Sequence, residues 1–127
     1  MPNAMKRKGD TYEISQLRYY RVSGFPHAQR TRAGYTRDGG DIHLDPVVGL
    51  APGVISQCKN VRTPRWSQWI TDLREQVRNA NAQFGFLAWK RHGVSDPAEQ
   101  LAVMPMAEFL YLVRLAGYGN PIEEYEA

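Results

Sequence analysis

The clearest pattern in the chain is a helical repeat of apolar residues in its second half. Apolar side chains recur three or four positions apart, at Trp66, Trp69, Ile70, Leu73, Val77 and Ala80. Charged residues occupy the other side, so this segment predicts an amphipathic helix. Its spacing places Trp69 in the core, whereas Trp66, at the helix start, is the best candidate for an exposed aromatic ring.

Two further helices are expected nearer the ends of the chain. Asp10-Thr11-Tyr12-Glu13 has the spacing of a capping box, which predicts a helix from Asp10 to Val22. Pro105 suits the first turn of a last helix, which Gly117 ends. The apolar stripe of that helix is formed by Met106, Phe109, Leu110 and Val113.

Short apolar or alternating segments between these helices predict strands. Residues 28–40 are polar and rich in glycine, which suits a short strand and a turn, and residues 41–44 alternate as a strand does. Residues 54–58 and 84–89 form apolar runs, and 101–104 gives a last short strand. This order of elements predicts an α/β fold, with a mixed central sheet of four to five strands flanked by helices.

Composition and charge narrow the class of protein. The 127 residues suit one domain, and no apolar run is long enough to span a bilayer or to follow the basic N-terminus as a signal peptide would. The single cysteine, Cys58, excludes a disulfide framework and favours a reduced, cytoplasmic location.

We divide the chain into a basic lead-in (1–8), one domain (9–118) and an acidic tail (119–127). The first 38 residues carry a net charge of +5 against +3 for the whole chain, which suggests a polyanionic partner such as nucleic acid.

Three segments of the chain contain candidate catalytic residues. Asp41 begins one expected strand, and Gln57 and Lys59 lie two residues apart on the next, so their side chains share a face. The loop 45–53 can fold this strand back beside Asp41, while Glu13 lies upstream on a helix. Carboxylate and amide oxygens suit Mg²⁺, and an ammonium group beside them suits metal-assisted cleavage of a phosphodiester. Each residue also has a structural interpretation: Glu13 as a helix cap, Asp41 as a turn residue and Lys59 as a solvated strand end.

These residues, taken in order, resemble a known family. The matched segments are Lys8-Gly9-Asp10-Thr11-Tyr12-Glu13, Arg30-Thr31-Arg32-Ala33-Gly34, Gly40-Asp41-Ile42, Gln57-Cys58-Lys59-Asn60 and Lys90-Arg91. Over about residues 8–117 the chain resembles the PD-(D/E)XK nuclease superfamily and, within it, the Holliday junction resolvases of the archaeal and phage type.

The resemblance implies a restriction-endonuclease-like core and a role for each matched residue. Asp41 would be the central metal ligand, Lys59 the catalytic lysine, and Glu13 the helix carboxylate that completes the acidic cluster. Gln57 and the main-chain carbonyl of Cys58 would be further ligands of Mg²⁺, for which Mn²⁺ is the expected substitute. The expected DNA contacts are the basic residues Lys8, Arg30, Arg32, Arg37, Arg62, Lys90 and Arg91. The protein would be a homodimer that resolves four-way DNA junctions, in the nucleoid or in the cytoplasm of a phage-infected host.

The chain departs from the family pattern at two positions and leaves other functions open. Gly40 stands where proline is common, and Gln57 stands where most relatives place Glu or Asp. Gln57 is either natural, as in the Q-x-K of some restriction nucleases, or an engineered Glu→Gln change. The alternatives are a restriction or repair nuclease acting on duplexes or flaps, a catalytically silent DNA-binding relative, and a protein-interaction domain that uses the acidic tail and tyrosines.

Overall fold

The chain forms three helices and a five-stranded sheet within the part that the computed structural model describes, residues 4–31, 40–45 and 53–123. The elements are α1 (Ala4–Val22), β1 (Gln29–Arg30), β2 (Ile42–His43), β3 (Val54–Lys59), α2 (Trp66–Asn79), β4 (Phe84–Trp89), the 3₁₀ helix η1 (Pro97–Glu99), β5 (Leu101–Val103) and α3 (Met106–Leu115). The predicted α/β class is confirmed. None of the helices in these ranges is long and apolar enough to cross a membrane.

The sheet is mixed, as predicted. Its strand order is β1-β2-β3-β4-β5, in which only β3 and β4 are parallel neighbours and the other pairs are antiparallel. Two adjacent parallel strands need a crossover connection, and α2 supplies it. The carboxyl ends of β3 and β4 therefore lie at the same edge of the sheet, where Lys59 is paired with Trp89.

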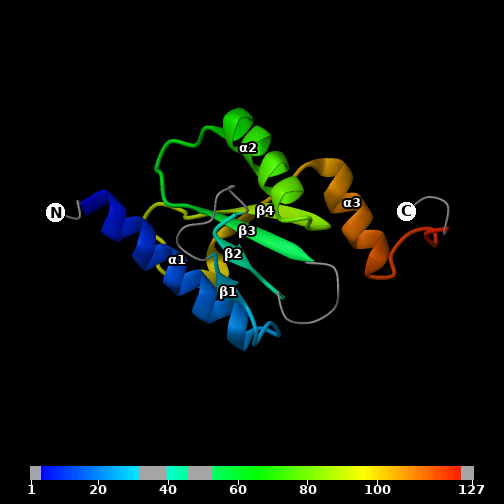
Figure 1. Cartoon of the computed structure of the whole chain (residues 1–127), viewed down its shortest axis with the longest axis horizontal. Coiled ribbons are helices and arrows are strands. Elements are labelled where there is room, and N and C mark those ends of the chain that lie inside the picture. Colours follow the sequence, from blue (N-terminus) through cyan, green and yellow to red (C-terminus); the bar gives the residue numbers. More distant parts are fainter. Residues whose placement is uncertain (1–3, 32–39, 46–52, 124–127) are drawn as a thin grey trace.

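Helices α1 and α2 lie on opposite faces of the sheet (Figure 1), and each face carries an apolar core. On one face α1 contributes Leu17 and Tyr20, which pack with Ala28, Ile42 and Leu44. On the other face α2 contributes Trp69 and Leu73, which pack with Ile55 and Leu87. Ser56 and Cys58 consequently point toward α1, while Ile55, Gln57 and Lys59 point toward α2.

Gly85 lets α2 approach β4 closely. A Cβ atom at this position would lie 2.6 Å from Cγ2 of Val77 and 3.0 Å from Cδ1 of Leu73. Only a residue without a side chain fits between this strand and this helix.

The start of α1 differs from the sequence prediction. The helix begins at Ala4, so the capping-box interpretation of Asp10 and Glu13 is wrong and residues 4–8 are helical. These residues include Ala, Met, Lys and Arg, which are strong helix formers and extend the helix upstream. Asp10 and Glu13 instead form ion pairs with Arg30.

The apolar stripe predicted for α3 does not pack into the core. Met106, Phe109 and Leu110 are exposed, and no residue of this helix is buried. The helix contacts the sheet through Tyr111, whose ring lies 5.9 Å from that of Phe84. The periodicity identified an apolar helix correctly, but the side that carries Met106, Phe109 and Leu110 faces solvent.

Candidate active site

Asp41 is fixed against β3 at the start of β2. The register pairs Ile42 with Ser56, so the preceding residue, Asp41, lies opposite Gln57. Its backbone N–H donates to the Ser56 carbonyl (3.1 Å), and its Oδ2 accepts from the Cys58 N–H (2.9 Å). The predicted meeting of Asp41 and the Gln57 strand is therefore present in the structure.

The backbone conformation before Asp41 explains why position 40 is a glycine. Gly40 has a φ of +90°, and a Cβ there would lie 3.0 Å from Cδ1 of Ile55. Proline is restricted to a φ near −65°, so a proline at position 40 could not adopt this backbone.

Gln57 has a buried amide oxygen. Its Oε1 is shielded from solvent and, among the residues that the structure describes, accepts no hydrogen bond. A buried polar atom in this state is costly, and such atoms are normally satisfied by a donor, a water or a cation. An amide oxygen of this kind fits the preference of Mg²⁺ for hard oxygen ligands.

Cys58 supplies backbone groups, and its thiol is held neutral. The N–H and C=O of a strand residue project to the same side, so the Cys58 carbonyl faces the side on which Asp41 accepts the Cys58 N–H. Burial, followed by the Asp41 and Glu13 carboxylates, raises the pKa of the Cys58 thiol, which hydrogen bonds with Ser56. The side chain packs against the core on the α1 side, as predicted, but it is half-buried rather than fully buried.

Lys59 lies on the same face as Gln57 and is oriented by an aromatic ring. Its Nζ is 5.3 Å from the centroid of the Trp69 ring, a cation–π distance. Trp66 contacts both Trp69 and Trp89 edge-to-face, with centroids 5.5 Å apart in each case. As predicted, Trp69 is buried and Trp66 is exposed.

Glu13 lies on α1, on the face of the sheet opposite Gln57 and Lys59, and it is engaged by Arg30. Glu13 Oε1 accepts from Arg30 Nε at 2.7 Å, and Asp10 lies 3.4 Å from the same guanidinium. The hydrogen bond that Arg30 donates to the Glu13 carboxylate raises the pKa of Arg30. In the described ranges no group of three or more His, Cys, Asp or Glu side chains is placed to hold a metal ion. The register places the backbone of Asp41 opposite that of Gln57, and the Asp41 carboxylate is bonded to the Cys58 N–H.

Two tyrosines that the sequence analysis did not assign to the site anchor α1 beneath it. The Tyr12 hydroxyl donates to the Ala88 carbonyl (2.9 Å), and the Tyr20 hydroxyl hydrogen bonds with Ser56 Oγ (2.8 Å). Burial raises the pKa of both phenols. The signal in the sequence is the helical spacing of Tyr12, Gln16 and Tyr20, all of which are buried.

A basic pocket of about 670 Å³ lies at the carboxyl ends of β3 and β4. Its lining contains no acidic side chain. The cationic and polar residues that line it are Arg7, Lys8, Thr11, Ser15, Asn60, Arg62, Lys90, His92 and Ser95. The carboxyl ends of adjacent parallel strands are a common place for ligands to bind.

The pocket gathers part of the predicted DNA-binding set. Lys8, Arg62 and Lys90 line it, together with Arg7 and His92, which were not predicted. Lys90 Nζ donates to the Val94 carbonyl (2.8 Å), and Arg91 Nη1 donates to the Glu99 carbonyl (3.2 Å).

The other predicted DNA contacts are placed differently. Arg30 lies outside the pocket lining and pairs with Glu13 and Asp10, while Arg32 and Arg37 lie outside the described residues.

Comparisons with protein families, curated proteins and solved structures give no match to this chain. Its function is therefore inferred from the chemistry of its own residues.

Proposed function

We propose that this chain is a Mg²⁺-dependent endonuclease of the PD-(D/E)XK type that cuts branched DNA, with four-way junctions as the preferred substrate. The observation that carries the proposal is the position of Asp41 opposite Gln57, whose buried amide oxygen accepts no hydrogen bond from the residues that the structure describes. Lys59 follows on the same face. A mixed five-stranded sheet flanked by helices also agrees with the restriction-endonuclease-like core that the resemblance implies.

The donor set fits one hard divalent cation. Asp41, the Gln57 amide and the Cys58 carbonyl are the groups that would hold it. When bound, Mg²⁺ supplies charge neutralisation at the phosphate and a more acidic water. Lys59 would orient the attacking water and stabilise the negative charge that develops on the phosphate oxygens. Hydrolysis forms one bond from water oxygen to phosphorus and breaks one P–O bond of the backbone.

The basic pocket is proposed to hold the DNA backbone. It begins directly after Lys59, at Asn60, and its cations come from α1 and from the loops after β3 and β4. Contacts of this kind recognise phosphates and shape without reading base sequence, and they weaken steeply with salt.

Gln57 also supports a second candidate, a catalytically silent relative that binds junctions. With an amide in place of a carboxylate, the site keeps an oxygen donor but loses one negative charge, so its affinity for Mg²⁺ falls. Glu13 is moreover neutralised by Arg30. The nuclease proposal also includes a homodimer. Restriction- or repair-type substrates are the alternative to junctions, since the same site would cut them.

The test compares the protein as written with its Gln57→Glu version on a labelled four-way junction, a flap and a linear duplex, with and without Mg²⁺. The control is Gln83→Glu, the same change at an exposed glutamine just before β4. We expect the Gln57→Glu version to cut the junction in Mg²⁺, while the control behaves like the unchanged protein.

The other possible results distinguish the alternative functions. Cleavage by the unchanged protein identifies Q-x-K as a working site, and a preference for flaps or duplexes identifies a repair- or restriction-type nuclease. Junction binding without cleavage by either protein identifies the silent relative. If neither protein binds or cuts any of the substrates, the proposal is wrong.

A further inference from the structure

Helix α3 is apolar on nearly all sides and yet has no buried residue. Its large side chains, together with Tyr118 just beyond its end, expose between 41% and 69% of their surface: Met106, Phe109, Leu110, Leu112, Leu115 and Tyr118. Only Glu108 and Arg114 are charged within the helix. Helices that are apolar all round are normally covered, and exposed apolar patches of this kind mark interaction sites.

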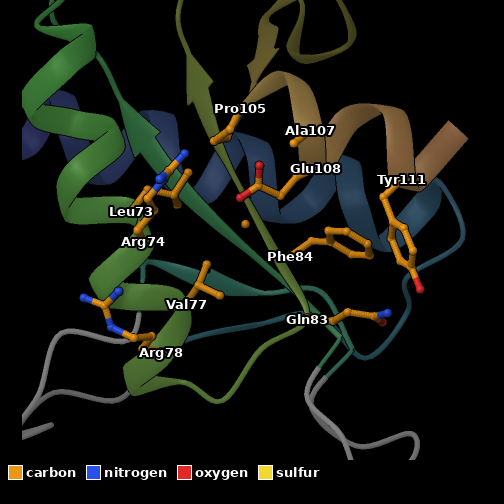
Figure 2. Close-up of a pocket in the computed structure, with 11 residues that line it drawn as sticks. Leu73, Arg74, Val77, Arg78, Gln83, Phe84, Pro105, Ala107, Glu108 and Tyr111 are labelled. Atoms are coloured by element: carbon orange, nitrogen blue, oxygen red, sulfur yellow. The ribbon is translucent and has the colours of Figure 1, made fainter. Parts of the chain in front are cut away.

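We call these exposed side chains the α3 ridge. A groove lies beside the ridge, between α2 and α3 (Figure 2). Its volume is about 700 Å³, and apolar side chains form most of its wall: Leu73, Val77, Phe84, Pro105, Ala107 and Tyr111. Arg74 and Arg78 come from α2, and Glu108 comes from α3. A protruding apolar ridge and an apolar groove thus share one helix.

We propose that the α3 ridge and the α2–α3 groove form the interface of a two-fold dimer of this chain. In a two-fold contact each copy offers the same surface, so the ridge of one copy can enter the groove of the other while its own groove receives the partner's ridge. The opposite charges of Arg78 and Glu108 allow each copy to pair with the other across the rim. A different partner would need a matching ridge and groove of its own.

The area is sufficient for a stable contact. Six large apolar side chains at this exposure amount to several hundred Å², and a two-fold contact buries this area on both copies, near the roughly 1,200 Å² at which specific interfaces begin. The groove begins at Gln83 and Phe84, at the amino end of β4, whereas Lys59 lies beside the carboxyl end of β4. The interface therefore leaves both candidate active sites accessible.

The α3 face would be the interface of the homodimer in the proposed function, and its test does not depend on nuclease activity. The experiment measures molecular mass by sedimentation over a series of protein concentrations, without DNA or Mg²⁺. Leu110→Glu places a charge on the ridge, and Ala107→Trp fills the groove from an exposed position. Val22→Glu is the control, since Val22 is an apolar residue at the end of α1 that is 84% exposed.

We expect a dimer that dissociates on dilution, and a dissociation constant that rises at least about tenfold in both α3 variants but not in the control. Circular dichroism of each variant should match that of the unchanged protein, which excludes unfolding as the cause. A monomer at every concentration overturns the proposal and leaves the face to another protein or a lipid surface. A dimer that neither α3 variant weakens, or that the control weakens equally, also overturns it. Because no cleavage is measured, these results are independent of those for the nuclease.

Discussion

The backbone N–H of Cys58 donates to Oδ2 of Asp41 at 2.9 Å, so β3 itself holds the carboxylate that begins β2. This bond predicts a difference between two substitutions. Asp41→Ala leaves the N–H without this acceptor and should lower the free energy of unfolding by about 1–3 kcal/mol. Asp41→Asn keeps an oxygen acceptor and should lose less. Urea denaturation measures both, and equal losses would show that the bond does not stabilise the fold.

The Glu13–Arg30 pair predicts an increase in DNA affinity on substitution. Glu13→Gln removes a negative charge beside Arg30 and leaves Asp10 as the remaining carboxylate partner of the guanidinium, so Arg30 should contact phosphate more readily. Because Arg30 is substantially exposed, stability should change by less than about 1 kcal/mol. Glu75→Gln on α2 removes an exposed carboxylate elsewhere and serves as the control. Fluorescence anisotropy with a junction gives the affinities, and a decrease for Glu13→Gln would argue against this arrangement.

The basic pocket predicts a change in salt dependence. Replacing both Arg7 and Lys8 with Gln should weaken binding to every DNA sequence and reduce the slope of log affinity against log salt by about one for each phosphate that the protein no longer neutralises. Arg18→Gln, an exposed change further along α1, should have a smaller effect because Arg18 lies outside the pocket. Titrations at several salt concentrations give the slopes. Equal slopes for the pocket variant and the control would place the DNA elsewhere.

Close packing predicts opposite effects at two glycines. Gly85→Ala forces a methyl group against Val77 and Leu73 and should destabilise the fold by about 1–3 kcal/mol. Gly9→Ala, inside α1 with no atom within 4 Å of the new Cβ, should stabilise it by about 0.5–1 kcal/mol. Thermal and urea unfolding of the two variants should give changes of opposite sign. A stable Gly85→Ala variant would mean that α2 moves away at little cost.

The buried hydroxyl and thiol groups predict a loss of stability at alkaline pH. Burial raises the pKa of Tyr12, Tyr20 and Cys58 in the folded protein above the ordinary values of 10.0 for tyrosine and 9.0 for cysteine. The unfolded chain releases these protons first, so the free energy of unfolding should be constant below pH 9 and fall as the pH rises through 9 and 10. Tyr12→Phe removes one such group and should flatten the decline. An unchanged slope in that variant would contradict the assignment.

The sequence predicted the elements whose pattern matches their packing. The spacing from Trp66 to Ala80 identified α2, and the apolar runs identified β3 and β4, because these elements are buried on the faces that their patterns show. The pairing of Asp41 with the Gln57 strand followed from the need to fold the chain back after β2.

The features that the sequence did not predict depend on interactions between distant segments. Asp10 and Glu13 have capping-box spacing, but the same spacing also suits a helix side that pairs with Arg30, which lies 17 residues after Glu13. The periodicity of α3 reveals an apolar side without revealing what covers it. Arg7 and His92 line one pocket because the first turns of α1 lie beside the loops that follow β3 and β4.

The environment of Cys58 has a practical consequence for experiments on this protein. It is the only cysteine in the sequence, it is half-buried against the core on the α1 side, and its thiol has a raised pKa. Thiol-reactive probes should therefore modify this residue slowly in the folded protein, because the thiolate is the reactive form. A cysteine introduced at a fully exposed position should react faster, so short labelling times direct a fluorophore or spin label to the new position.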